Sequence, residues 1–600
     1  MRKFLVMSLV LCMLLGVFAA CDFGGNETEG TTTESVEESK SESESKSEAT
    51  SSESASESES TTVDEEQELL NEAKAGLPNY DEDIAFTTAD GYELKQYNGE
   101  DIEKYYSAYK YYLEEGYTVY SKNQVGESKS VTLVNGDAYA IVMYNGNMEE
   151  LYIGHSESGA EAFPEVLTSL GDDSIVPTVT QHYSEDSNGL CYFVKLSDGS
   201  FLVWDGGYDF DTDDAYQTLV KLNGSEEGIH IRAWLITHSH GDHYEMFETF
   251  SQRYADKVTL DRVMYSPIYS ELDNGYDVVG HDVYLNELVQ IAAARFDGAV
   301  LCPVHTGMSF TFGNIKYEVL ASPEHIYKDN NDPQDFNETS VVTRLVHEEG
   351  SMIFLGDCGV YVCNWMLDAY GDGLKSDMVQ VAHHGGETAN KEVYDAIQAH
   401  TLFWPCNEPL LNTTRGEYVK QHILEAEYSK EHLLHSYGNI TRAINYKAKE
   451  PEYINLFPRD VSLVYTSPNV SNMRMEDGVL KYDVVAGEGS FDPNFCYEVK
   501  NIDTKKCNAI RVVINTDSLA GEMYYTAGSD KKLNFSDNRI QRLGYTGASE
   551  DGTTTLIIFL ADTEDYTGKL TSLRWDFGTE VGQTVEIYSI EGFYVNVDAK

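Results

Sequence analysis

The chain has few basic residues for its length. Its 600 residues include 42 Lys and Arg against 101 Asp and Glu, which gives a formal net charge of −59. Duplex nucleic-acid binding depends on Lys and Arg side chains that neutralise phosphates. No basic stripe interleaved with aromatic residues is visible in the sequence. The composition therefore argues against a protein that wraps duplex DNA. It leaves small phosphodiesters open, because bound metal ions would supply positive charge themselves.

Residues 1–21 contain an apolar run that is short for a membrane span. Phe4 to Val17 is apolar, whereas a spanning helix needs roughly 20 residues. Arg2 and Lys3 precede the run, and Phe18-Ala19-Ala20-Cys21 follows it. This order predicts a lipoprotein signal peptide and an exported protein, anchored to the outer face of the bacterial cell membrane by a lipid on Cys21. An uncleaved anchor or plain secretion stays open, and both keep the protein outside the cytoplasm.

Aromatic residues are missing from residues 26–65, which consist almost entirely of Ser, Glu and Thr. Such a segment buries too little apolar surface to offset its conformational entropy, so residues 22–65 are predicted to form a disordered tether. The nine cysteines are irregularly spaced and predict neither a disulfide framework nor a Cys₄ zinc site. The remaining length allows several folded domains.

Four residues of metal-binding type lie close together in residues 237–243. His238, His240, Asp242 and His243 follow a run from Ile231 to Ile236 that is typical of a buried strand. Alternate residues of an extended segment share a face, so His238 and His240 are expected to point the same way. Asp242 and His243 then turn toward a second point. Imidazole and carboxylate suit Zn²⁺, and also Mn²⁺ or Fe, so the spacing favours two adjacent metal ions.

This H-x-H-x-D-H pattern resembles the signature of the metallo-β-lactamase fold, and three further segments match that family in order. They are Leu202 to Gly207, Ile353 to Asp357 and Val379 to Gly386. The resemblance implies an α/β fold, an αββα sandwich forming a catalytic domain over residues 176–448. It also implies two divalent metal ions, with zinc expected first and Mn or Fe as alternatives.

Two segments look like the metallo-β-lactamase-like domain of the DNA-uptake channel protein ComEC. They are residues 375–386, with the His-His-Gly element, and residues 337–342, with an Asn-x-x-Ser pattern. In that subfamily the Asn-x-x-Ser segment stands where other members carry a metal-binding His. This chain likewise has no Gly-His-Thr-x-Gly element between His243 and Asp357. His305 is an alternative third ligand, although an ordinary surface or core His is favoured.

The resemblance implies a role for each residue. His238 and His240 hold the first metal, Asp242, His243 and His383 hold the second, and Asp357 bridges both. His383 is favoured over His384 because the first imidazole of the matching motif lies at the strand end. Asp242 and His435 are the candidate catalytic residues, His435 as a general acid or substrate contact. The supporting or less certain positions are Asp205, Asn337, Ser340 and His384.

The flanking regions predict two further modules. Residues 66–175 are expected to form a small α+β module, with a helix over 99–115 and strands near 129–134, 138–144 and 149–154. Tyr105, Tyr109 and Tyr112 form a stripe on that helix; packing is the favoured interpretation, and recognition of a wall polymer is the alternative. Residues 452–600 predict an all-β sandwich. Its last strands resemble carbohydrate-binding modules, so contact with a cell wall or glycan is a hypothesis beside a spacer role.

The function implied by the resemblance is an extracellular hydrolase of phosphodiester or ester bonds that uses a metal-bridged hydroxide. Expected substrates are short single-stranded nucleic acid, nucleotides or a phosphate ester on a wall polymer. Duplex nucleic-acid binding is not expected, and a β-lactam is the least favoured substrate. The rival hypothesis is a cell-surface binding protein whose metal site is structural or vestigial.

Overall fold

A computed structural model describes residue 71 and residues 82–596 of the chain, with internal gaps. The gaps are residues 89, 100–101, 185–187, 268–284, 326–335, 387, 412–416, 517–519, 530–531, 534, 536–539, 545–551 and 561–564. The predicted signal peptide, Cys21 and the tether lie outside the described residues. Among the described helices, none combines the length and apolar character needed to cross a bilayer.

The N-terminal module is one antiparallel sheet with a helical segment against it. The sheet order is β1-β2-β6-β5-β4-β3, and the helical segment consists of η1 and α3. The predicted strands are confirmed, whereas the helix predicted over 99–115 is a 3-10 segment, η1, followed by a short α-helix, α3. Tyr105 is 2 % exposed, and Tyr109 and Tyr112 pack against the same core. Packing therefore accounts for the tyrosine stripe. The bounds are β1 (Glu82–Thr87), β2 (Glu93–Asn98), η1 (Ile102–Ala108), α3 (Tyr109–Glu114), β3 (Thr118–Val125), β4 (Ser128–Asn135), β5 (Ala138–Asn145) and β6 (Glu150–Ser156).

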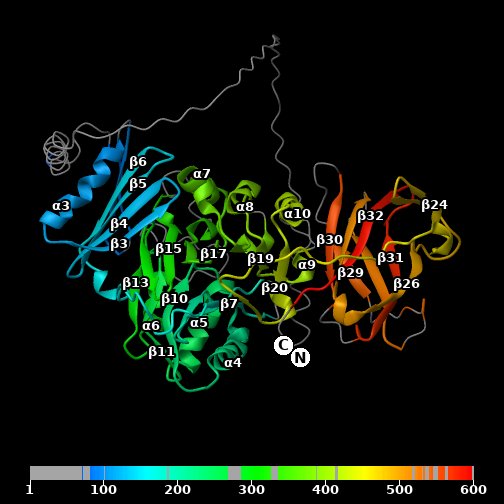
Figure 1. The fold of residues 1–600 in the computed structure, drawn as a ribbon, viewed down its shortest axis with the longest axis horizontal. Coiled ribbons are helices and arrows are strands. Elements are labelled where there is room, and N and C mark those ends of the chain that lie inside the picture. The colour runs from blue at the N-terminus through cyan, green and yellow to red at the C-terminus, as the bar shows by residue number, and fades with distance from the viewer. Residues whose placement is uncertain are drawn as a thin grey trace, which may run out of the picture. The chain divides into compact units, whose positions relative to one another are not determined.

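The central domain contains two sheets that pack face to face, as the αββα prediction requires. The first sheet has the order β13-β12-β10-β9-β8-β7-β21, with β11 paired to β10, and the second has β14-β15-β16-β17-β18-β19-β20. Figure 1 shows helices on the outer face of each sheet, α4 to α6 on one and α7, α8 and α10 on the other. The helix bounds are α4 (Thr212–Asn223), α5 (Gly241–Arg253), α6 (Leu285–Ala293), α7 (Val360–Tyr370), α8 (Lys391–Ile397) and α10 (Glu417–Glu425).

The strands of the first sheet are β7 (Thr178–Gln181), β8 (Tyr192–Lys195), β9 (Phe201–Trp204), β10 (Ile229–Ile236), β11 (Val258–Leu260), β12 (Arg262–Tyr265), β13 (Val300–Pro303) and β21 (Ile440–Ala443). Those of the second sheet are β14 (Ser309–Phe312), β15 (Ile315–Ala321), β16 (Val342–His347), β17 (Gly350–Phe354), β18 (Met378–Gln380), β19 (Thr401–Trp404) and β20 (Glu431–Leu434).

Strand β9 shows why its sequence is apolar throughout. Phe201 and Val203 pack toward helices α4 and α5, whereas Leu202 and Trp204 belong to the core between the two sheets. Because successive side chains of a strand point to opposite faces, a strand covered on both sides has no polar position. This buried strand ends at Trp204, and the next residue, Asp205, enters the candidate site.

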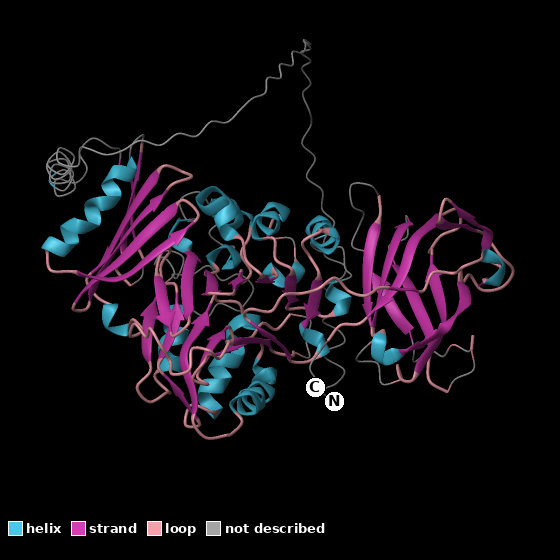
Figure 2. Cartoon of the chain, viewed as in Figure 1, coloured by secondary structure: helices cyan, strands magenta, loops and turns pink. Residues whose placement is uncertain are grey.

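The C-terminal region is a sandwich of two antiparallel sheets around its own core, which confirms the all-β prediction (Figure 2). One sheet has the order β24-β25-β32-β27-β30, and the other has β23-β26-β31-β28-β29. The bounds are β22 (Ile454–Asn455), β23 (Tyr465–Thr466), β24 (Val470–Glu476), β25 (Val479–Val484), β26 (Phe495–Asp503), β27 (Ala509–Thr516), β28 (Ala520–Thr526), β29 (Ile540–Gly544), β30 (Thr554–Phe559), β31 (Lys569–Phe577) and β32 (Thr584–Phe593).

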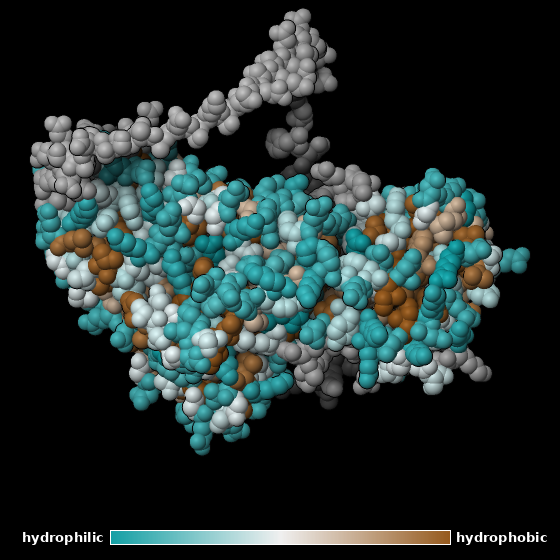
Figure 3. Space-filling view, viewed as in Figure 1, coloured by the Kyte–Doolittle hydropathy of each residue, from teal (hydrophilic) through white to brown (hydrophobic). Residues whose placement is uncertain are grey.

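Hydrogen bonds and a ring contact join this sandwich to the central domain. The Gln421 side-chain amide donates to the Thr555 carbonyl at 3.0 Å, and its oxygen accepts from the Thr555 N–H at 2.8 Å. The rings of Tyr437 and Phe559 contact each other nearby, with centroids 3.9 Å apart and planes tilted by 38°. Side chains facing water are mostly hydrophilic on the face shown in Figure 3, in keeping with the high charge.

Candidate metal centre

The candidate site lies where strands of both sheets end. Strands β9 and β10 run parallel in the first sheet, and β17 and β18 run parallel in the second. The carboxyl ends of parallel strands meet at one edge of a sheet, so the residues that follow them can converge. His238 follows β10, Asp357 follows β17, and His384 follows β18. The structure brings these residues into two clusters that share Asp357.

The first ligand group consists of His238, His240 and Asp357, whose ligand atoms lie within 4.8 Å of one another. His238 Nε2 is 3.1 Å from His240 Nδ1 and 4.0 Å from Asp357 Oδ2. Ser340 supports this group from two sides. Its hydroxyl lies 3.4 Å from His238 Nδ1 and accepts the backbone N–H of Asp357 at 3.1 Å. The group thus has two imidazoles and one shared carboxylate.

The second ligand group is larger and consists of Asp242, His243, Asp357 and His384. His384 Nε2 lies 3.1 Å from Asp242 Oδ2 and 3.3 Å from Asp357 Oδ2, and His243 Nε2 lies 3.2 Å from Asp357 Oδ1. The side chains of His243 and His384 are 0 % and 1 % exposed, whereas Asp242 is 14 % exposed. Asp242 is the member through which the group meets the surface.

Asp205 holds the second group in place without joining it. Its carboxylate accepts the backbone N–H of Thr237 at 2.7 Å and lies 2.9 Å from His243 Nδ1. It also accepts the Thr237 hydroxyl at 2.9 Å. A carboxylate bound to one ring nitrogen fixes the orientation of an imidazole and leaves the other nitrogen for a metal. Asp205 adopts a φ of 52°, a left-handed conformation that Asp tolerates better than most residues.

Burial and charge act differently on the histidines of the two groups. Burial alone would lower the pKa of His243, yet the carboxylates of Asp357, Asp205 and Asp242 hold it well above its usual value. Burial also opposes the charged form of His384, but Asp357 and Asp242 raise its pKa to about 9. Burial lowers the pKa of His238 well below its usual value, and the neighbouring imidazoles add to that effect. His238 is therefore neutral, which is the form that binds a metal.

Three buried ligand atoms lack a hydrogen bond of normal geometry to any described residue. They are His243 Nε2, His384 Nε2 and Asp357 Oδ1. Buried polar atoms are nearly always hydrogen-bonded, so such a cluster calls for an explanation. Imidazole and carboxylate atoms that converge within about 5 Å suit divalent Zn, Mn or Fe. The donor set therefore fits the two metal ions that the sequence predicts.

The structure revises the choice between His383 and His384. His384 joins the second group, while His383 Nε2 lies 3.9 Å from Asp357 Oδ2 and its side chain is 15 % exposed. Both residues have left-handed backbone, with φ of 47° and 56°. This turn carries the second imidazole rather than the first into the group. His384 Nδ1 donates to the Pro405 carbonyl at 2.8 Å, which aims Nε2 at the carboxylates.

The other candidate residues lie around the two groups. Asn337 lies in η5 (Phe336–Thr339), where its carbonyl accepts the Ser340 N–H at 3.0 Å. His435 is buried, and its Nδ1 donates to the Gly189 carbonyl at 3.0 Å, so it contacts a neighbouring loop. His305 contacts Tyr139 at 2.9 Å and lies 3.4 Å from Asp90 of the N-terminal module. It therefore does not supply the third imidazole of the first group.

Two supporting residues were missed by the sequence analysis. The Asn188 side chain donates to Asp242 Oδ2 at 2.7 Å, and the Pro405 carbonyl orients His384. A lone Asn in a loop and a backbone carbonyl give no signal in a single sequence. Their positions relative to the site become visible only in the folded chain.

Comparison with protein families supports the fold class. Residues 185–259 match the family model described as the metallo-beta-lactamase superfamily. This segment contains Asp205, His238, His240, Asp242 and His243. No curated protein sequence matches the chain significantly.

Solved structures show weak similarity. The diiron β-hydroxylase CmlA from Streptomyces venezuelae matches 45 % of this chain and 54 % of its own, at 13 % identity and a TM-score of 0.29. The chain thus spans about half the length of that enzyme. The metallo-beta-lactamase fold protein YhfI from Bacillus subtilis matches 38 % of this chain and 85 % of its own, at 11 % identity and a TM-score of 0.24. A low-affinity xylan binding module from Roseburia intestinalis matches 22 % of this chain and 92 % of its own, at 14 % identity and a TM-score of 0.15.

Proposed function

We propose that this protein is a metal-dependent hydrolase of phosphodiester or ester bonds. The observation that carries the proposal is the pair of ligand groups that share Asp357. Two-metal sites place their ions about 3.5–4 Å apart, and a shared carboxylate is suited to hold them at that separation. A purely structural site would be expected to close around one ion with four ligands.

The chain's own residues position such a centre. Two bound divalent ions would activate water and polarise the bond to be cleaved. Asp205 orients His243, Ser340 orients both His238 and Asp357, and Asn188 fixes Asp242. Hydrogen bonds of this kind reduce the freedom of the ligands and so preorganise the site. His435 remains a candidate general acid, placed next to the loop that carries Asn188.

The substrate class follows from charge. A chain with a net charge of −59 repels long polyanions, so a small phosphodiester, a nucleotide or a phosphate ester on a larger polymer is favoured over duplex DNA. The rival is a cell-surface binding protein whose metal site is structural or vestigial. The small first group, with two imidazoles, favours this rival, because such a group binds its metal less tightly.

The test uses the full chain purified without chelator. Metal content is measured by elemental analysis, and turnover is measured on bis-p-nitrophenyl phosphate, p-nitrophenyl phosphorylcholine, single-stranded DNA and nitrocefin. About two metals per chain with phosphodiester turnover are expected. The combined substitution His240→Ala and Asp357→Ala removes ligands from both groups and should abolish both signals. His422→Ala, at a half-exposed His that pairs with Asp395, is the matched control. Tightly bound metal without turnover on any ester would favour the binding protein.

We also propose that the protein is exported and carries a lipid on Cys21. The support is the charged start, the apolar run from Phe4 to Val17 and the small residues before Cys21. Mass spectrometry of the protein from cell membranes should find a diacylglyceryl-modified N-terminal Cys. Cys21→Ser should release the protein from the membrane fraction. Unchanged membrane association of this variant would contradict the lipid anchor.

A further inference from the structure

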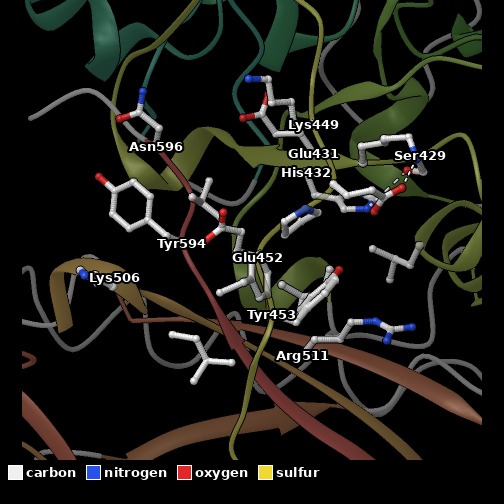
Figure 4. A pocket seen from close by; sticks show the side chains of 18 of the residues that line it. Ser429, Glu431, His432, Lys449, Glu452, Tyr453, Lys506, Arg511, Tyr594 and Asn596 are labelled. Atoms are coloured by element: carbon white, nitrogen blue, oxygen red, sulfur yellow. Dashed lines mark hydrogen bonds and ion pairs between the residues drawn. The ribbon is translucent and has the colours of Figure 1, made fainter. Parts of the chain in front are cut away.

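A second cavity lies at the junction of the central domain and the C-terminal sandwich. It has a volume of about 760 Å³, which is within the roughly 300–1,000 Å³ of small-molecule sites. Its walls come from the end of the central domain, the connecting segment 446–454, the turn at 505–506 and the end of β32. Figure 4 shows Tyr453, Tyr594 and Lys449 around this space. None of the metal-centre residues lines it.

The charge of this cavity is opposite to that of the chain. Acidic residues outnumber basic residues by 101 to 42 overall, but the cavity lining contains twice as many basic as acidic side chains. The basic ones are Lys430, Lys447, Lys449, Lys505, Lys506 and Arg511. Acidic residues keep a protein of this net charge soluble, but solubility does not explain why the charge of this cavity lining is positive.

Not all of these cations are neutralised by neighbours. Lys430 pairs with Glu450, Lys447 pairs with Asp377, and Arg511 pairs with Glu591. Lys449, Lys505 and Lys506 are exposed, and no ion pair to a described residue engages them. Three ammonium groups from two separate segments therefore remain available to an anionic ligand.

The cavity also offers flat rings and hydrogen-bonding groups. Tyr453 is 44 % exposed and Tyr594 is 50 % exposed. Aromatic faces of this kind can pack against sugar rings, which have an apolar side. Glu452 and Asn596 also line the cavity and can accept hydrogen bonds from hydroxyl groups (Figure 4). The carboxylate of Glu452 would repel a dense polyanion. It suits a ligand that has many hydroxyl groups and few negative charges.

We propose that this cavity binds an anionic saccharide, a short sugar chain that bears carboxylate or phosphate groups. Lys449, Lys505 and Lys506 would contact the anionic groups, and Tyr453 and Tyr594 would contact the rings. The proposal does not depend on hydrolysis at the metal centre. It assigns a binding site to the junction itself rather than to a face of either sheet of the sandwich.

Isothermal titration calorimetry on the full chain tests the proposal with four probes. Trigalacturonate represents the carboxylated class, a phosphorylated trisaccharide represents the phosphorylated class, maltotriose is the neutral control, and a short oligothymidylate represents nucleic acid. Binding of at least one anionic trisaccharide is expected, weakening as salt is raised because the contacts are ionic. Whichever of the two anionic trisaccharides binds shows whether the cavity recognises carboxylate or phosphate groups. Binding of maltotriose as tight as that of both anionic sugars, or of the oligothymidylate alone, would overturn the proposal.

Variants then locate the site. Lys505→Gln combined with Lys506→Gln should weaken binding roughly tenfold or more, since each substitution loses a charge-assisted hydrogen bond to the anionic group. Tyr453→Ala should weaken it independently. Lys500→Gln combined with Lys532→Gln is the matched control, because these exposed lysines of the same sandwich do not line the cavity. Phosphodiester turnover should be unchanged in all of them. Equal losses in the control and the test pair would show that the site lies elsewhere.

Discussion

The two ligand groups of the candidate metal centre differ in their number of ligands, in the groups that support them and in the pKa values of their histidines. The first has two imidazoles besides Asp357, and the second has two imidazoles and a second carboxylate besides Asp357. A hydroxyl, that of Ser340, supports the first, whereas a buried carboxylate, that of Asp205, supports the second. The histidine charges also differ, because carboxylates raise the pKa of His243 and His384, whereas burial lowers that of His238. Because the second group has one more carboxylate ligand, we infer that it is the tighter metal site and that the first is the exchangeable one.

The largest effect is expected from the residue that both groups share. Asp357→Ala should remove both metals and reduce turnover to the uncatalysed background, because each group loses a negative ligand at once. Metal content and turnover on bis-p-nitrophenyl phosphate measure this. Asp395→Ala, at a half-exposed carboxylate outside the site, is the control. Retention of one tightly bound metal by Asp357→Ala would show that the groups are independent.

The next effect separates the two adjacent histidines. His384→Ala should lose one metal and most of the turnover, because its Nε2 lies 3.1 Å from Asp242 and 3.3 Å from Asp357. His383→Ala should retain both metals, because His383 Nε2 lies farther away and its ring is partly exposed. Elemental analysis of both variants decides. The reverse outcome would return the ligand role to His383.

The supporting residues should produce intermediate effects. Asp205→Asn should weaken metal binding by the second group and Ser340→Ala by the first, each by roughly 10–100-fold, as is typical of groups that orient ligands. Titration with a competing chelator should show which of two phases shifts. If both substitutions shifted the same phase of metal release to the chelator, the assignment of Asp205 and Ser340 to different ligand groups would be wrong.

The smallest effect on the metals is expected at His305. His305→Gln should leave metal content and turnover unchanged, because His305 faces Asp90 and Glu324 instead of the metal centre. Burial opposes the charged form of His305, but the carboxylates of Asp90 and Glu324 raise its pKa to about 9. In the unfolded chain the pKa of a His is about 6.5. The charged imidazole therefore stabilises the folded state, and this contribution is fully present below about pH 6.5. This contribution should disappear as the pH rises through about 9. The unfolding temperatures of the wild-type protein and of His305→Gln, measured between pH 6 and 10, should therefore converge at high pH. A loss of one metal would make His305 a ligand.

Most of the predicted ligands come together in the structure because they follow strand ends in chain order. His238, His240, Asp242, His243 and Asp357 all fall in the two groups, since a buried strand fixes where the next residues point. The structure places His384 rather than the predicted His383 in the second group, because both residues adopt left-handed backbone and alternation along an extended chain no longer applies.

Contacts between segments distant in sequence could not be predicted. His305 meets Asp90 only because the N-terminal sheet packs on the central domain. The junction cavity likewise combines side chains from Lys430 to Asn596. Neither arrangement leaves a periodic pattern in the chain, because each depends on how completed domains meet.

The end of strand β19 contacts both the junction cavity and the candidate metal centre. The indole N–H of its last residue, Trp404, donates to Nδ1 of His432, which lines the junction cavity, at 3.2 Å. The next residue, Pro405, accepts the hydrogen bond that orients His384. A ligand that displaces His432 would thus act on the same two-residue segment that positions a metal-binding imidazole. By reciprocity, any change in saccharide affinity on metal loading must be matched by an equal change in metal affinity on saccharide binding.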